Sequence, residues 1–221
     1  MSGFGYTDEA RALQARFDTE RLAGALLDVI VHDALDGNDR AFIGSRDMFW
    51  LSTVDPEGMP TVSYKGGAPG LVAILDDRTL AFPSYDGNGM FYSMGNIEGT
   101  SKVGLLFMDF ERPHRIRLQG EARLSDDPAL VGRWPGAQLA VVVDVKALFQ
   151  NCPRYVHRMR RAESSRYVPD GNGDAPVPGW KRIDAIQPVL PARDANEAER
   201  GGGTIAMEEY GAMLERGDPE A

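Results

Sequence analysis

A glycine-rich segment in the first half of the chain has the composition of an anion-binding turn. It reads SYDGNGM at residues 84–90, between an expected strand at residues 79–83 and an expected helix at residues 90–96. Glycine permits positive φ angles and close backbone approach, and the first amides of a helix lack partners within the helix. Such a turn suits a phosphate group. Strand-turn-helix units with glycines are also common without a ligand, so the segment alone leaves both interpretations open.

Polar side chains around this turn are candidates to complete a phosphate site. Ser84, Asn88 and Ser93 offer hydrogen-bond donors, and Lys65 stands at an expected strand end beside two glycines. Its ammonium would neutralise a phosphate, although an ordinary exposed lysine fits the sequence as well. Three aromatic side chains offer flat surfaces to an aromatic ligand, unless they belong to the core: Trp50, Tyr85 and Phe91.

A second candidate segment lies around the only cysteine. The sequence NCPRYVHR follows an apolar run, and residues 147–161 are expected to be helical around Pro153. Arg154 and Arg158 would then share one helix face and bind an anion, or pair with surface carboxylates. Cys152 is either a reactive thiol or a small buried apolar group, and the second interpretation is the more common one.

Several kinds of site are excluded by the motifs that the sequence lacks. The three histidines lie in unrelated segments and no paired Cys/His spacing occurs, so a metal site is not expected. The sequence also lacks a G-x-S-x-G motif, a Walker-type loop and a dinucleotide-binding fingerprint. No catalytic residue can be assigned from the sequence.

Composition narrows the class of protein. The chain has 221 residues, 43% of them hydrophobic, and a net charge of −9. An acidic chain is a poor ligand for nucleic acid or an anionic membrane. A polar N-terminal segment without an apolar core argues against a signal peptide, and a single cysteine suits a reducing compartment. We therefore expect a cytoplasmic protein with neither nucleic-acid nor membrane partners.

The elements that would position these residues are mainly strands. The clearest is residues 114–124, where apolar and polar residues alternate strictly, as in a strand with one buried and one exposed face. Residues 49–54 and 61–64 read as a hairpin around the turn DPEG. Four further strands are expected at 71–75, 79–82, 103–107 and 139–145. Six or seven strands with short connections predict an antiparallel barrel of mainly β (α+β) class, closed or nearly closed.

Helices are expected chiefly at the two ends of the chain. Leucines and isoleucines at helical spacing predict a helix at residues 22–31, capped by Asp18 or Thr19, and residues 40–45 suit a short second helix. Residues 126–128 can start another short helix, and residues 205–216 a terminal one. These elements divide the chain into a helical segment at 1–39, a barrel at 40–162 and an irregular extension at 163–221.

The order and spacing of these segments resemble the FMN-binding split barrel of the pyridoxamine 5′-phosphate oxidase-like proteins. The match runs through residues 47–97 (DMFWLSTVDPEGMPTVSYKGGAPGLVAILDDRTLAFPSYDGNGMFYSMGNI) and 102–124 (KVGLLFMDFERPHRIRLQGEARL), with QNCPRYVHR and WKRIDAIQPVLP following. The resemblance implies an antiparallel six- to seven-stranded split barrel with flanking helices. It also implies a homodimer with FMN at the interface, lined by both chains.

Carried onto this chain, the resemblance implies thirteen cofactor-binding residues. Residues 63–65 would lie along flavin and phosphate, 84 and 85 at the ring, 88–91 at the phosphate with 93 as a cap, and 152–154 over the pocket, from either chain. The set comprises Ser63, Tyr64, Lys65, Ser84, Tyr85, Asn88, Gly89, Met90, Phe91, Ser93, Cys152, Pro153 and Arg154.

Two departures from the family pattern shape the functional expectation. Many members carry an arginine after the asparagine of the turn, whereas Gly89 and Met90 stand here, so charge compensation falls on Lys65, Arg154 or backbone amides. No histidine follows Trp180 as in enzymes that act on vitamin B6 phosphates, so vitamin B6 synthesis is not expected.

The resemblance implies an FMN-dependent oxidoreductase for an unknown small molecule, reduced by a donor such as NAD(P)H and reoxidised by a small acceptor or oxygen. In such a site the flavin carries the electrons and the protein positions it. The alternatives are a non-catalytic flavin-binding sensor or stress-response protein, a barrel that binds haem or deazaflavin F420 instead, and a dimeric interaction protein with an empty pocket.

Overall fold

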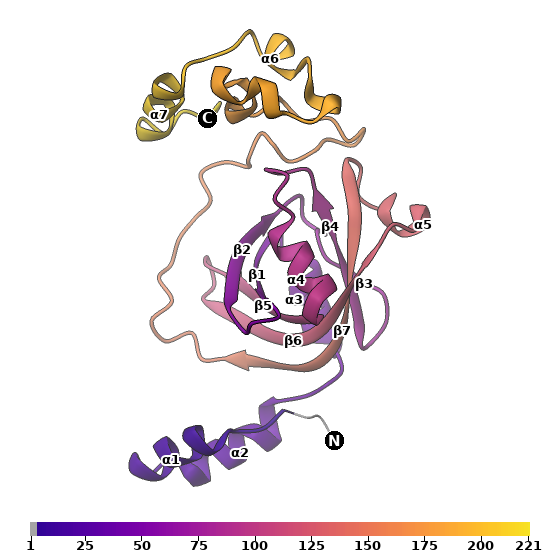
Figure 1. Ribbon diagram of the computed structural model, residues 1–221. Coiled ribbons are helices and arrows are strands. Elements are labelled where there is room, and N and C mark those ends of the chain that lie inside the picture. Colours follow the sequence, from indigo (N-terminus) through magenta and orange to yellow (C-terminus); the bar gives the residue numbers. More distant parts are fainter. Residues whose placement is uncertain (1–3) are drawn as a thin grey trace. The chain divides into compact units, whose positions relative to one another are not determined.

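The computed structural model describes residues 4–221 and contains two compact units, of which the first ends at Ala162 and the second begins at Glu163. The first unit contains the whole sheet, and its strands curl into a barrel (Figure 1). Among the described residues, no helix is long and apolar enough to cross a membrane.

The sheet has seven strands in the order β2-β1-β5-β6-β7-β4-β3, and every neighbouring pair is antiparallel. The two edge strands, β2 and β3, do not pair with each other, so the barrel remains split. This confirms the predicted mainly β, split-barrel fold, with an open sheet. The strands are β1 Met48–Val54, β2 Pro60–Gly66, β3 Ala73–Ile74, β4 Thr79–Tyr85, β5 Lys102–Asp109, β6 His114–Ser125 and β7 Ala137–Asn151.

Alternating side chains fix which face of each strand lines the barrel interior. In β1, Phe49, Leu51 and Thr53 are fully buried, whereas the residues between them are partly exposed. In β6, Ile116 and Leu118 are buried and the intervening polar residues are exposed. The buried set joins one continuous core, and a one-residue slip would move it into solvent.

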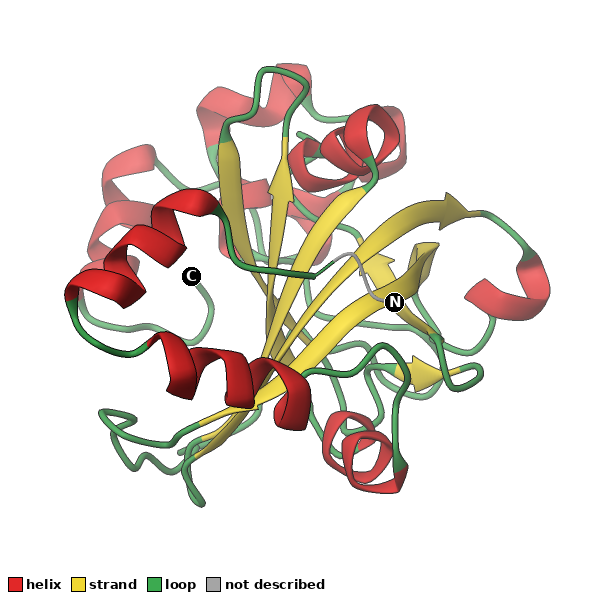
Figure 2. Ribbon diagram, turned by 90° about the horizontal axis from the view of Figure 1, so that it is seen from below, coloured by secondary structure: helices red, strands yellow, loops and turns green. Residues whose placement is uncertain are grey.

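A β-bulge lets the two longest strands twist around each other. The register of β6 against β7 shifts between Gln119 and Gly120. A Cβ atom at Gly120 would lie 2.6 Å from the backbone oxygen of Asp144, so only glycine permits this approach. Figure 2, in which the strands are yellow, shows that the strands of the sheet are strongly twisted relative to one another.

Helices occupy the ends and the concave side of the first unit. Two of them, α1 (Asp8–Arg16) and α2 (Glu20–Ile30), precede the barrel; α3 (Gly37–Gly44) begins with a capping box on Asp36. The helix α4 (Tyr92–Thr100) packs against β1, β5 and β6 within the barrel, as Figure 1 shows. A single-turn helix, α5 (Pro128–Val131), is capped by Asp127.

The sequence-based expectation of a helix at residues 147–161 is wrong. Residues 147–151 instead complete β7, which pairs with β6 along its length, and residues 152–161 contain neither helix nor strand. The physical reason is the long β6, whose backbone groups need a partner up to Arg115. Arg154 and Arg158 therefore do not share a helix face.

Smaller differences concern element bounds. The strand expected at residues 71–75 pairs only at Ala73–Ile74, α4 begins at Tyr92 rather than residue 90, and α1 was not predicted. The expected helices at 22–31, 40–45, 126–128 and 205–216 are present with shifted bounds. Thr19 stands at the N-cap of α2, but its side chain makes no capping hydrogen bond.

The second unit is built from short helices around a small core. After an irregular stretch it contains the 3-10 helices η1 (Gly179–Arg182), η2 (Asp184–Val189) and η3 (Ala192–Asp194), then α6 (Glu197–Arg200) and α7 (Met207–Glu215). Its core comprises Ile183, Ile205 and Met213. A buried ion pair, 3.0 Å between Lys181 Nζ and Asp194 Oδ2, supports this core.

Candidate functional site

The helix α4 is anchored to the sheet by polar contacts at both ends. Near its middle, the buried Asn96 amide donates to Thr53 Oγ1 at 3.1 Å, and the Thr100 hydroxyl donates to the Val54 carbonyl oxygen at 2.7 Å. In its first turn, Ser93 Oγ lies 3.3 Å from Ser63 Oγ of β2. These contacts direct the N-terminus of α4 towards the end of edge strand β2 that carries Lys65.

Within residues 4–221, the first amides of α4 have no hydrogen-bond partner and no side chain caps this helix. Its N-cap residue, Phe91, adopts a left-handed conformation with φ 48°, and no side chain caps the helix. The amides of Tyr92 and Ser93 precede the hydrogen bond from Gly95 N to the Phe91 carbonyl oxygen at 2.7 Å. Free amides at the positive end of a helix form a binding site for an anion.

Lys65 lies on the strand that contacts this helix start through Ser63, and it is partly desolvated. It is two residues beyond Ser63 on the same face of β2, opposite the buried Phe49 of β1. Burial lowers the pKa of its ammonium below the ordinary value of 10.5. Within residues 4–221, no ion pair joins Lys65 to a carboxylate. A desolvated cation without a counter-ion, on the strand that contacts a helix start with free amides, fits an anionic group well.

The glycine-rich turn connects β4 to this helix start. Gly89 has a positive φ of 74°, and Asn88 Oδ1 accepts a hydrogen bond from the Met90 amide at 3.1 Å. Ser84 and Tyr85 end β4 and are half-buried, and burial raises the pKa of the Tyr85 phenol. The structure therefore has the predicted order of strand, glycine-containing turn and helix, with Ser84 and Tyr85 at the strand end and Asn88 to Phe91 before the helix.

Some predicted site residues lie elsewhere in this protomer. Tyr64 points to the outer face of the sheet, where its ring lies 6.3 Å from that of Trp50, so neither aromatic shares a face with Lys65. Residues 152–154 are exposed and follow the last residue of β7, whereas Tyr85 pairs with its first, Ala137. Within one chain the Cys152–Arg154 segment is at the opposite end of β7 from Tyr85.

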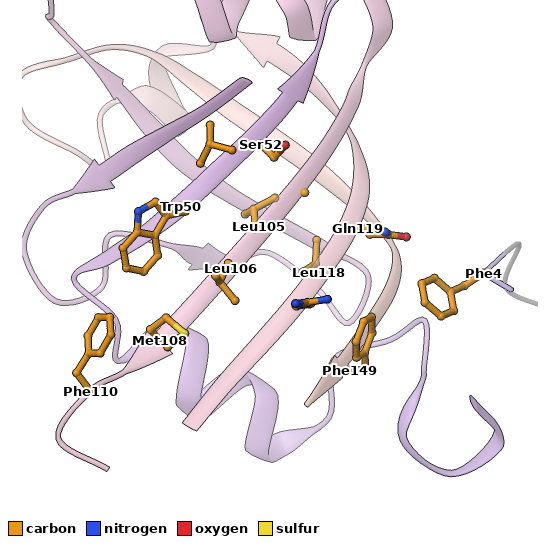
Figure 3. A pocket seen from close by; sticks show the side chains of 13 residues that line it. Phe4, Trp50, Ser52, Leu105, Leu106, Met108, Phe110, Leu118, Gln119 and Phe149 are labelled. Carbon is orange, nitrogen blue, oxygen red and sulfur yellow. The ribbon is translucent and has the colours of Figure 1, made fainter. Parts of the chain in front are cut away.

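An apolar groove of about 580 Å³ lies on the outer face of the sheet. Trp50 and Phe110 stand at one end, and Phe149 and Phe4 at the other (Figure 3). Its remaining lining comes from β1, β2, β5, β6 and the residues between: Ser52, Val62, Gly104, Leu105, Leu106, Met108, Arg117, Leu118 and Gln119. Sequence reasoning missed this groove, although the uninterrupted apolar run at residues 103–108 was a signal for a strand covered on both faces.

Sequence reasoning also missed the residue that fixes α4. The expected helix at residues 90–96 gives Asn96 no role of its own, yet this residue is only 6% exposed and its side-chain amide donates to the hydroxyl of the fully buried Thr53. An asparagine amid apolar residues of a short helix was the available signal, because a buried amide requires a partner.

A cluster of His32, Asp36 and Asp39 brings three possible metal ligands within 4.8 Å of one another. Its atoms already have partners: Asp36 Oδ1 caps α3, and Asp39 Oδ2 lies 2.7 Å from His32 Nε2. Burial opposes the charge of the imidazole, but its contacts with Asp39 and the Ile30 carbonyl outweigh burial and raise the pKa of His32 above 6.5. This cluster joins α3 to the segment after α2.

Comparison with known proteins gives a family match over the barrel. Residues 35–151 match the family described as pyridoxamine 5′-phosphate oxidase. No curated protein matches the chain. Among solved structures, a putative pyridoxamine 5′-phosphate oxidase from Lactobacillus delbrueckii is 22% identical, with TM-score 0.44, over 53% of this chain and 95% of its own.

Two further solved structures have the same level of likeness. HupZ from Group A Streptococcus is 19% identical, with TM-score 0.44, over 57% of this chain and all of its own. An FMN-binding protein from Syntrophomonas wolfei is 13% identical, with TM-score 0.41, over 64% of this chain and 96% of its own.

Proposed function

Because the chain belongs to the pyridoxamine 5′-phosphate oxidase family, we propose that it binds FMN at a homodimer interface and acts as an FMN-dependent oxidoreductase on a small molecule. The observation that carries the proposal is the contact of 3.3 Å between Ser63 Oγ and Ser93 Oγ, which joins the strand that carries the desolvated Lys65 to the uncapped N-terminus of α4. A phosphate there would supply the charge that Lys65 lacks and accept hydrogen bonds from the helix amides.

The thirteen candidate residues divide by role in this proposal. Lys65, Ser63, Ser93 and the turn at residues 88–91 hold the phosphate, while Ser84 and Tyr85 face the flavin ring. Because Gly89 and Met90 stand in place of arginine, the lysine and the backbone amides carry the charge compensation. Tyr64 and the Cys152–Arg154 segment would serve the site of a second copy, since Tyr64 faces the opposite side of β2 from Lys65 and the segment follows the end of β7 that is remote from Tyr85.

Exposed apolar side chains around the site support the proposed dimer. Val62 and Tyr64 of β2 are 64% and 61% exposed, and Met90 and Tyr92 beside the turn are 69% and 54% exposed. Val62 and Tyr64 stand on one face of the edge strand and Met90 and Tyr92 beside the turn, and large exposed apolar side chains of this kind mark surfaces that another molecule covers. A second copy over them would also exclude water from the flavin.

Bound FMN would supply two-electron transfer between a reductant such as NAD(P)H and a small acceptor or oxygen. The chain's own groups would position the cofactor, and no general base is required of them. Among the residues that the structure describes, no histidine or carboxylate lies against the Lys65 Nζ within ion-pair distance. We place the protein in the cytoplasm, where the exposed thiol of Cys152 stays reduced.

The proposal is tested by reducing the FMN-loaded protein anaerobically in a stopped-flow instrument. NADH or NADPH is expected to bleach the flavin absorption in a saturable manner, and oxygen or a small acceptor to restore it. If flavin binds but neither nicotinamide reduces it, the oxidoreductase assignment is wrong and a flavin-binding sensor takes its place. A deazaflavin or haem spectrum in the purified protein would instead contradict the choice of FMN.

A further inference from the structure

The two N-terminal helices form a hairpin that buries almost nothing in its own chain. Neither α1 nor α2 contains a buried residue. The hairpin, residues 4–31, is held by few contacts, among them the Tyr6 hydroxyl, which donates to the Ala23 carbonyl oxygen at 3.0 Å. Helices of nine and eleven residues depend on tertiary packing for their stability. A hairpin of this length therefore needs another surface.

The uncovered face of the hairpin is apolar. Leu22, Leu26 and Val29 are 60%, 41% and 80% exposed, and their spacing of four and three residues places them in one stripe of α2. Leu13 and Phe17 continue the stripe at the end of α1, with 54% and 66% exposed. The other half of the apolar surface of α2 is partly covered by the chain itself.

The outer-face groove is the complementary surface. It is apolar along its floor, and Phe4, at the base of the hairpin, lines one end beside Phe149 with ring centroids 5.4 Å apart (Figure 3). The groove and the hairpin are thus continuous on one side of the molecule. In a twofold dimer a surface contacts its own counterpart, so each hairpin would reach the groove of the other chain.

The charges of the hairpin and of the groove are complementary, which favours the docking of one into the other. Residues 4–31 contain five aspartates and glutamates against three arginines. Around the groove, Arg117 lies in its lining, and Arg112 and Arg160 flank Phe110, whose carbonyl oxygen accepts from the Met159 amide at 3.1 Å. These three arginines are exposed and form no ion pair within residues 4–221. A membrane surface fits less well, because interfacial helices carry a basic polar face.

We propose that the hairpin at residues 4–31 docks, by its stripe of leucine and valine side chains, into the outer-face groove of a second copy of the chain. This inference rests on the proposed homodimer and adds to it the surface that the N-terminal helices occupy. The flavin site, the groove and the hairpin would then all be completed by association.

The experiment compares two glutamate variants by sedimentation velocity over a range of concentrations. Val29→Glu puts a charge into the stripe at a side chain already exposed in the single chain. Gly24→Glu puts the same charge on the far side of α2, where a Cβ atom meets nothing within 4 Å. We expect the dimer dissociation constant to rise at least about tenfold for Val29→Glu and to stay unchanged for Gly24→Glu.

A second pair of variants tests the receiving surface. Arg112→Glu with Arg160→Glu is expected to weaken the dimer, and adding Glu9→Arg, which shares a face of α1 with Leu13, to recover part of the loss. Wild-type-like dissociation constants for Val29→Glu and the arginine pair would overturn the inference. FMN per chain is measured on the same samples: a flavin-free protein contradicts the proposed function, whereas a flavin-loaded dimer that ignores both changes contradicts only the docking of the hairpin. A chain that is monomeric at every concentration overturns both the dimer and the hairpin docking.

Discussion

Replacing Lys65 with methionine separates two effects of this side chain. One is the free energy that its burial costs the folded protein, and the other is its contribution to FMN binding. The side chain is partly desolvated, its pKa is lowered by burial, and it has no carboxylate partner among residues 4–221. If its ammonium binds the FMN phosphate, the loss of one charged hydrogen bond weakens binding by about 1.5–3 kcal/mol. This corresponds to a dissociation constant raised about 10- to 150-fold.

The same substitution is expected to stabilise the flavin-free protein. Methionine has a similar length and needs no hydration, so the desolvation penalty of the ammonium disappears. The pH dependence gives a further check. Because the pKa of Lys65 is lowered from 10.5, the folded protein binds fewer protons than the unfolded chain between the two values, and stability rises with pH there. FMN affinity falls over the same window, and both slopes vanish in Lys65→Met.

The assay is quenching of FMN fluorescence on binding, combined with urea unfolding of the flavin-free protein. Lys102→Met is the matched control, since it removes one exposed lysine at the start of β5. Its FMN affinity and stability should equal those of the unmodified protein. An unchanged affinity in Lys65→Met would refute the assignment of Lys65 to the phosphate. A loss of stability together with the loss of affinity would refute the argument from desolvation.

Three further substitutions test the helix, its anchor and the histidine cluster. Ser93→Asp adds a negative charge in the first turn of α4, so we expect it to stabilise the protein by about 0.3–1 kcal/mol in thermal unfolding. The same charge repels the phosphate and should weaken FMN binding at least about tenfold. Tighter FMN binding would contradict the proposed phosphate site. Asn96→Ala leaves the buried Thr53 hydroxyl without its partner, so the free energy of unfolding measured in urea should fall by about 1–3 kcal/mol. An unchanged free energy of unfolding would show that this hydrogen bond does not stabilise the protein. The stabilisation from His32, whose pKa is raised above 6.5, is complete below about pH 6.5 and is lost as the pH rises through the folded-state value. With 38% of its ring exposed, solvent screening limits this to less than about 1 kcal/mol, and a His32→Gln variant should show no such decline in unfolding experiments across that pH range.

The sequence predicted the sheet because its strands carry strong local patterns. Residues 114–124 alternate along the whole of β6, and the DPEG turn sets the β1–β2 register at Val54 and Pro60. The C-terminal half of β7 could not be predicted in the same way. Ala147 and Leu148 suit a helix as well as a strand, and only the long partner strand β6 decides between them.

The candidate site was predictable in its composition but not in its geometry. Glycines and small polar side chains at residues 84–93 indicated the turn and the helix start. Lys65 lies on the side of β2 that its pairing with Phe49 of β1 determines. This pairing between strands is part of the tertiary structure and cannot be read from the local sequence. The distance of residues 152–154 from Tyr85 likewise depends on the length of β7, which the sequence did not reveal.

The central claim is that this chain holds FMN, and the visible absorption spectrum of the purified protein tests it most directly. The protein is measured as purified and again after incubation with excess FMN and desalting, with FMN counted per chain. The account predicts a retained flavin spectrum at about one FMN per chain, as one charge-compensated phosphate site per protomer requires. A colourless protein that also fails to retain added FMN would contradict it.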